Sequence, residues 1–250
     1  MSLTKAEIAA NFDSFTASWK TELPKSIAAL ESHRDEFLKS YSRITSMNAW
    51  RGNVLEEKVP EASLEFFVEA LNDALVSHVF ARFGSWRSAL KSLRSCIENT
   101  CYCLYYKDHP VELRLWESGR HRPGFSEIHT YLEQHPDISP LGNSPLTGLA
   151  TMKEEYSTLS RAVHASAKSF RMSPNVHDIL LWKPDAASLG QWRTREQHTL
   201  CALNLLLTTM FRDFLSGAQQ TGLRRSLAVV IPSSMHARVK TELKVTIPTI

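Results

Sequence analysis

The sequence has no run of eighteen or more apolar residues, so no membrane-spanning helix is expected. Its first ten residues are polar and amphipathic, and they lack the apolar core of a signal peptide. Only four residues are cysteine, and three of them fall within one apolar segment, residues 96–103. This grouping favours reduced thiols inside a protein core over a disulfide framework. We therefore expect a cytoplasmic protein that does not enter a membrane.

The familiar catalytic signatures are missing as well. There is no glycine-rich phosphate loop, no Gly-x-Ser-x-Gly turn, no Cys-x-x-Cys pair and no His-Glu-x-x-His helix. Cys101 and Cys103 are two residues apart and point to different faces of a helix, which argues against a shared metal ion. The four histidines between positions 109 and 135 are irregularly spaced, which favours a solvated polar surface. We expect neither a bound metal nor a cofactor.

What the chain does contain is the composition of a globular protein. Apolar residues make up 43% of its 250 residues and charged residues 22%, which is enough for a core without disulfide or metal staples. The formal net charge is +3, but the charge is uneven. From Arg212 to the end there are six basic residues against two acidic ones. This excess favours a solvated basic face, with a surface for nucleic acid as the alternative.

Apolar residues recur every three or four positions along most of the chain, which predicts an all-α helical bundle. Pro24 is expected to break or kink the first helical segment. We expect three parts: an N-terminal helical segment with a linker, a core bundle, and a basic C-terminal extension that is irregular or carries a short strand at 227–231. Their bounds are 1–60, 61–216 and 217–250.

Two of the predicted helices carry ionisable residues beside an apolar stripe, where such groups need a partner or a chemical role. On the first, Arg94 and Glu98 are four residues apart, with the basic residue first, which is the weaker order for a surface pair. They form either a buried ion pair that specifies packing or a phosphate-binding arginine oriented by Glu98.

On the second helix, Tyr156, Ser160 and His164 follow one another at intervals of four and share a face. Arg161 lies three residues before His164, and a neighbouring guanidinium favours the neutral imidazole that a general base needs. His164 and an arginine would suffice for RNA cleavage by transesterification without a metal. The alternative is a structural histidine at the end of a helix.

The order of these segments resembles that of the HEPN-like helical proteins of bacterial abortive-infection and antiphage systems. The resemblance covers about residues 85–216. It consists of the Arg-Ser-x-x-Glu helix, a His-Pro turn, the segment Leu113-Arg114-Leu115-Trp116, and the Tyr-x-x-Leu-Ser-x-x-x-His helix. It implies a helical-bundle ribonuclease that needs no metal and often dimerises, so that two Arg-x4-6-His motifs face each other.

His164 lies too close to Arg161 to form that motif, but four other segments have its spacing. They are Arg114 to His121, Arg122 to His129, Arg171 to His177 and Arg193 to His198. The pair Arg193 and His198 opens the last long helix and is the best placed of the four. The candidate catalytic residues are therefore Arg94, Glu98, Tyr156, Arg161 and His164, with Arg193 and His198 as an alternative pair.

Three functions follow from these patterns. The first is a defence or toxin-type effector that cleaves RNA, with RNA as partner and a homodimer as its assembly. The second is a non-enzymatic helical subunit that buries its tryptophans, including Trp50, Trp116, Trp182 and Trp192, against a protein partner in a larger complex. The third is a sensor bundle that holds a small anionic molecule between Arg94, Tyr102 and His164.

Overall fold

A computed structural model describes residues 4–164, 166, 168–173, 175, 180–215 and 220–249. This part of the chain is helical and contains no strand, which confirms the expected all-α class. The longer helices are α1 (Lys5–Ala29), α2 (Arg34–Trp50), α4 (Glu61–Arg82), α5 (Trp86–Asp108), α8 (Leu149–Val163) and α9 (Ala186–Met210). The shorter ones are α3 (Glu56–Lys58), α6 (Pro110–Glu117), α7 (Phe125–Gln134), α10 (Thr221–Val230) and α11 (Ser233–Leu243).

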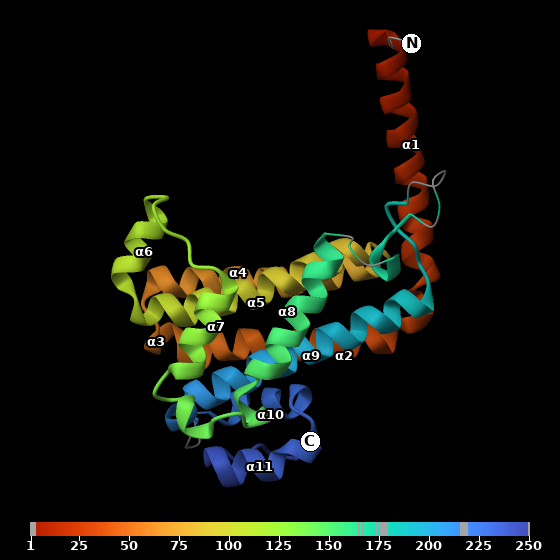
Figure 1. Cartoon of the computed structure of the whole chain (residues 1–250). Helices are drawn as coiled ribbons and strands as arrows, with labels where there is room; N and C mark the ends of the chain where they lie inside the picture. The colour runs from red at the N-terminus through yellow and green to blue at the C-terminus, as the bar shows by residue number, and fades with distance from the viewer. Residues whose placement is uncertain are drawn as a thin grey trace.

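Helices α4 and α5 run side by side (Figure 1). The chain reverses between them at Gly84, whose φ of +71° suits a residue without a Cβ. Helix α5 is buried around much of its circumference, as its sequence predicts. Leu93, Ile97 and Leu104 on α5 are completely excluded from solvent.

Helices α2 and α9 pack beside this pair and are joined to each other by buried polar contacts. Arg43 on α2 donates from Nε and Nη2 to Oε2 of Glu196 on α9, at 2.8 and 2.5 Å. The indole nitrogen of Trp50 donates to Oδ1 of Asn204 at 3.0 Å. Because all four side chains are buried, a different alignment of α2 on α9 would leave polar groups without partners.

Helix α8 begins where the chain passes very close to α9. Gly148, its N-cap, has a φ of +70°, and a Cβ at this position would overlap the backbone oxygen of Ala202. Glycine is the residue that allows both this backbone conformation and this approach. Nearby, Oγ1 of Thr209 on α9 donates to the backbone oxygen of Leu146 at 2.9 Å. These contacts set the position of α8 along α9, and therefore which of their side chains meet.

The C-terminal region is helical, so the short strand expected over residues 227–231 is wrong. Leu223, Leu227 and Val230 are buried on α10 at intervals of four and three, which is the period of a helix. A short apolar run does not by itself distinguish a strand from a buried helix, which explains the error. Helix α10 packs on α2 and α9. The division of the chain into three parts stays a prediction.

Helix α1 projects away from the bundle (Figure 1). It runs through Pro24 without a break, and near its base Oγ of Ser26 donates to the backbone oxygen of Phe83 at 2.8 Å. No residue from Thr4 to Glu22 is buried. Across the described ranges, no helix combines the length and the hydropathy that crossing a membrane requires.

Candidate functional site

Polar side chains of α5 and α8 meet in a half-buried cluster, as the two sequence motifs suggest. Arg94 donates from Nε to Oγ of Ser160 at 3.1 Å and from Nη2 to the hydroxyl of Tyr156 at 2.5 Å. Its Nη2 also lies 3.0 Å from Oε1 of Glu98, which accepts the Tyr156 hydroxyl at 2.9 Å. The predicted Arg94–Glu98 ion pair is present within α5, and Tyr156 and Ser160 of α8 bind to it across the interface between the two helices.

Tyr156 is held in this cluster on both faces of its ring. Phe125 of α7 stacks on it with centroids 3.7 Å apart, and the Arg94 guanidinium carbon lies 4.7 Å from the ring centroid. Burial and the adjacent Glu98 carboxylate raise the pKa of Tyr156 to about 12, so the phenol stays protonated near neutral pH. Because Arg94, Glu98 and Tyr156 already satisfy one another, we infer that this cluster mainly ties α5 to α8.

His164 and Arg161 lie at the other end of α8 and are exposed. Within the described part of the chain the His164 side chain makes no hydrogen bond, whereas Arg161 donates to Oγ1 of Thr158 at 3.3 Å. The arginine that reaches this helix end is Arg87 of α5, which donates to the backbone oxygens of residues 162 and 163 at 3.3 and 2.8 Å. The hydrogen bonds of Arg94 are made one and two turns earlier, so the structure does not join Arg94 to His164.

A second constellation lies between α8 and α9, centred on the carboxylate of Glu155. The Glu155 side chain is only 3% exposed, and its Oε1 lies 2.8 Å from Nη1 of Arg195 and 2.9 Å from Nδ1 of His198. Its other oxygen, Oε2, is buried and has no hydrogen-bond partner among the described residues. Burial raises the pKa of Glu155, while the attraction of His198 and Arg195 opposes that rise. The Glu155 carboxylate thus fixes the orientation of both basic side chains.

The predicted pair Arg193 and His198 is divided between two carboxylates. Nη1 of Arg193 lies 2.8 Å from Oε2 of Glu36 on α2, whereas His198 contacts Glu155 on α8. The arginine that the structure joins to His198 is Arg195, three residues before it on the same helix. Sequence analysis missed Arg195 and Glu155. The available signal was that Glu155 lies within the apolar stripe of α8, where an unpartnered charge would be costly.

A groove of about 640 Å³ runs between α8 and the start of α9 and is lined by three arginines, Arg161, Arg193 and Arg195. Thr158, Gln191 and Thr194 add polar groups to its walls. No described residue of this lining is acidic. Because Arg195 belongs both to the groove and to the Glu155 constellation, His198 stands next to an arginine-rich surface suited to phosphate. We name this surface the arginine groove.

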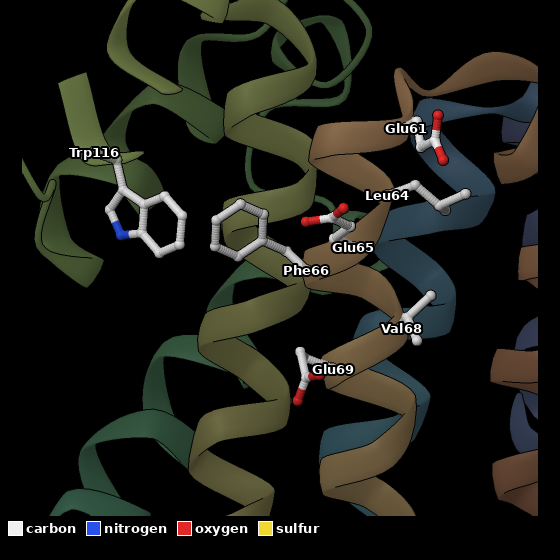
Figure 2. Close-up of a pocket in the computed structure, with 7 residues that line it drawn as sticks. All are labelled: Glu61, Leu64, Glu65, Phe66, Val68, Glu69 and Trp116. Atoms are coloured by element: carbon white, nitrogen blue, oxygen red, sulfur yellow. The ribbon is translucent and has the colours of Figure 1, made fainter. Parts of the chain in front are cut away.

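A second groove, of about 450 Å³, has the opposite character and lies between α4 and α6 (Figure 2). The rings of Phe66 and Trp116 meet edge to face there, with centroids 4.8 Å apart. Glu61, Glu65 and Glu69, one helical turn apart, line the α4 side of this groove (Figure 2). Three carboxylates repel phosphate, so this groove is not a site for nucleic acid. We name it the acidic groove.

Close to the acidic groove, Asp73 is a half-buried carboxylate on α4. Nδ2 of Asn99 donates to its Oδ2 at 2.8 Å. Burial, opposed by this hydrogen bond and reinforced by Glu69 and Glu98, raises the pKa of Asp73 to about 6. The folded protein therefore binds a proton at Asp73 more tightly than the unfolded chain does.

This pKa gives stability a pH dependence. The contribution of Asp73 is fully present below its ordinary pKa near 4 and is lost as the pH rises to about 6. As the pH is raised over this range, the midpoint temperature of thermal unfolding should fall less for the Asp73→Asn variant than for wild type. The Glu65→Gln variant, altered on the exposed side of α4, should follow the wild-type profile. If the midpoint temperature of wild type and that of Asp73→Asn depend on pH in the same way, the pKa of Asp73 is not raised in the folded protein.

Among the described residues, none of the other arginine and histidine pairs with the spacing of the HEPN motif is joined by a hydrogen bond. His129 is buried; its Nε2 lies 3.1 Å from the backbone oxygen of Leu149, while Arg122 contacts Tyr102 instead. Arg114 and His121 share no hydrogen bond or ion pair among the described residues. His177, the partner of Arg171 in the fourth pair, lies outside the described residues. Nor do three His, Cys, Asp or Glu side chains of the described ranges gather around a point where a metal ion would fit.

Comparison with protein-family models, with characterised proteins and with solved structures gives no match for this chain. The resemblance to HEPN-like proteins therefore stays a prediction. The function proposed below depends on the geometry of the arginine groove and of the Glu155 constellation.

Proposed function

We propose that the protein binds RNA along the arginine groove and cleaves its backbone, with His198 as the general base and no metal required. The observation that supports this function is the shared carboxylate oxygen: Oε1 of Glu155 holds both Nδ1 of His198 and Nη1 of Arg195. A base oriented by a buried carboxylate, beside a fixed guanidinium, is a combination that phosphoryl transfer uses.

The proton on the His198 ring is placed by this contact. When Nδ1–H donates to the Glu155 carboxylate, Nε2 of the neutral ring carries the lone pair that accepts a proton. The ring is 47% exposed, so a 2′-hydroxyl can approach it. Once deprotonated, the 2′-oxygen attacks the adjacent phosphorus, the bond to the 5′-oxygen breaks, and water supplies the proton to that leaving oxygen.

The arginines supply the positive charge that this reaction needs. Negative charge accumulates on the non-bridging phosphate oxygens as the 2′-oxygen attacks, and a guanidinium can donate two hydrogen bonds to them. Arg195 is held next to His198 and serves this role. Arg161, on the wall of the groove, binds a neighbouring phosphate, and Arg193, although paired with Glu36, is 44% exposed and adds positive charge. The need for a 2′-hydroxyl makes RNA, and not DNA, the substrate.

The test is incubation of the purified protein with end-labelled single-stranded RNA in excess EDTA. Wild type is expected to shorten the RNA and to leave the same sequence in DNA intact. RNA that stays intact at every protein concentration, with and without added divalent cations, would exclude a stand-alone nuclease. Expression in bacteria, followed by inspection of total RNA, extends the test to the proposed role as a defence or toxin-type effector.

Binding to the groove makes a separate prediction. The Arg161→Ala variant is expected to bind a non-cleavable 2′-O-methyl RNA more weakly and to reduce the slope of log affinity against log salt by about one. Lys153→Ala, which removes an exposed cation of α8 outside the groove, is the matched control and should keep the wild-type slope. Fluorescence anisotropy over a series of salt concentrations measures both. Equal losses in the two variants would show that RNA does not bind in the groove.

The acidic groove favours a second candidate function, that of a subunit in a larger complex. Exposed Trp116 and the glutamates around it suit an amphipathic helix with a basic face from a protein partner. The groove repels RNA, so this role is compatible with the first and does not depend on it.

A further inference from the structure

Helix α1 carries an apolar stripe that the described residues of the bundle leave uncovered. Ile8, Phe12 and Phe15 are 55%, 66% and 53% exposed, and Trp19 and Leu23 continue the same face of the helix. Scattered apolar residues are ordinary on a protein surface, but a contiguous stripe on a projecting helix marks an interaction surface. A partner that covers this stripe must be elongated and must have apolar residues at a matching spacing.

The apolar positions of the stripe have nearly the same order when α1 is read from either end. About a point between residues 15 and 16, Ile8 is the mirror position of Leu23, and Phe12 is that of Trp19. Two copies of α1 laid antiparallel therefore place Ile8 of one opposite Leu23 of the other and Phe12 opposite Trp19, while Phe15 lies beside Thr16 at the centre. A two-fold interface requires this kind of self-complementarity. The intervals along the stripe are four, three, four and four residues, which is the spacing of helix-to-helix packing.

The charges along α1 favour the same arrangement. The N-terminal half has Lys5 against Glu7 and Asp13, a net charge of −1, whereas the C-terminal half has Lys20 and Lys25 against Glu22, a net charge of +1. An antiparallel pair brings each negative half beside the positive half of the other copy. A parallel pair would align like charges.

The base of α1 offers a place for the end of the second helix. A groove of about 670 Å³ lies between α1 and the segment at residues 180–184, and it is lined by Phe15, Trp19, Leu181 and Trp182. Leu181 is 43% exposed there. In the antiparallel arrangement, the N-terminal turns of the second α1, with Ile8, reach this groove. The contact would therefore extend from the projecting helix onto the bundle.

We propose that α1 is a dimerisation arm, covered by α1 of a second copy of this chain in antiparallel orientation. Burial of Phe12, Phe15 and Trp19 from both copies drives the association, and the opposite charges of the two halves select its direction. This proposal does not depend on the proposed nuclease activity, since its test measures mass and cross-linking alone.

The first test is sedimentation equilibrium of the full chain over a range of concentrations. Wild type is expected to sediment at the dimer mass, and Phe12→Glu with Phe15→Glu at half that mass. Ser14→Glu with Ala17→Glu, on the opposite and exposed face of α1, should remain dimeric. Because these positions lie on the projecting part of α1, the thermal unfolding of the bundle should not change in either variant. A wild-type monomer at all concentrations, or a dimer that survives the Phe12 and Phe15 substitutions, would overturn the proposal.

The second test reports the direction of the helices. Thr16 lies beside the mirror point, so Thr16→Cys is expected to form an intermolecular disulfide rapidly under mild oxidation. Ser14→Cys, on the outer face, should cross-link no faster than wild type, whose cysteines at 96, 101 and 103 are buried. Equal cross-linking of the two variants would contradict an antiparallel pair centred at this point.

Discussion

The His198→Ala variant is expected to cleave RNA about 100- to 10,000-fold more slowly than wild type, which is the usual contribution of a positioned general base. The substitution removes the nitrogen that accepts the 2′-hydroxyl proton and leaves Arg195 in contact with Glu155. Affinity for a non-cleavable RNA should therefore change little while the cleavage rate falls. Single-turnover cleavage with saturating protein separates the two quantities.

The control for this variant is His164→Ala. His164 is exposed at the end of α8 and, within the described part of the chain, has no hydrogen-bond partner for its ring. The His164→Ala variant should retain most of the wild-type rate and unfold at the wild-type temperature. The His198→Ala variant removes one of the two partners of the buried Glu155 carboxylate, so it should unfold at a somewhat lower temperature. Loss of cleavage in His164→Ala with normal cleavage in His198→Ala would show that the general base is His164 and not His198.

The free energy of unfolding of the Gly148→Ala variant is expected to be lower than that of wild type by about 4 kcal/mol or more. Losses of this size are caused by backbone strain and by clashes in the core. Alanine at a φ of +70° is strained, and its Cβ would overlap the backbone oxygen of Ala202, which cannot move without displacing α9. Since this approach sets α8 against α9, the variant should also separate Glu155 from His198. Denaturant unfolding measures the first effect and RNA cleavage the second.

Gly124→Ala is the matched control for that loss. Gly124 is also the N-cap of a helix, α7, but its φ is −78° and a Cβ there would meet no atom within 4 Å. Its stability should stay within about 0.5 kcal/mol of wild type, as for a surface substitution. If Gly148→Ala and Gly124→Ala have the same free energy of unfolding, the close approach of α8 to α9 does not determine the geometry of the site.

The all-α class was predictable from the sequence because the apolar period of a helix is a local property, repeated over many turns. The Arg94–Glu98 pair was predictable for the same reason, since both residues lie on one helix. What the sequence did not reveal was that Arg94 would bond to Tyr156 and Ser160 and not to His164. That outcome depends on the crossing of α5 and α8, which tertiary packing decides.

The Glu155 constellation was missed because Glu155 lies forty residues or more before Arg195 and His198 in the chain. The spacing rule selected Arg193, but the side chain of Arg193 turns to Glu36 on α2. Arg195 is the residue that meets Glu155, and this follows from the position of α8 along α9. That position depends on one glycine, Gly148, whose φ and close approach cannot be predicted from a single sequence.

The measurement that tests the central claim most directly is the chemistry of the new RNA ends. If His198 removes the 2′-hydroxyl proton beside Arg195, wild type in EDTA should produce 2′,3′-cyclic phosphate and 5′-hydroxyl ends, identified by mass spectrometry. The His198→Ala variant should produce these ends only at the residual rate. Products with 5′-phosphate ends, or cyclic phosphates formed equally well by His198→Ala, would contradict the account.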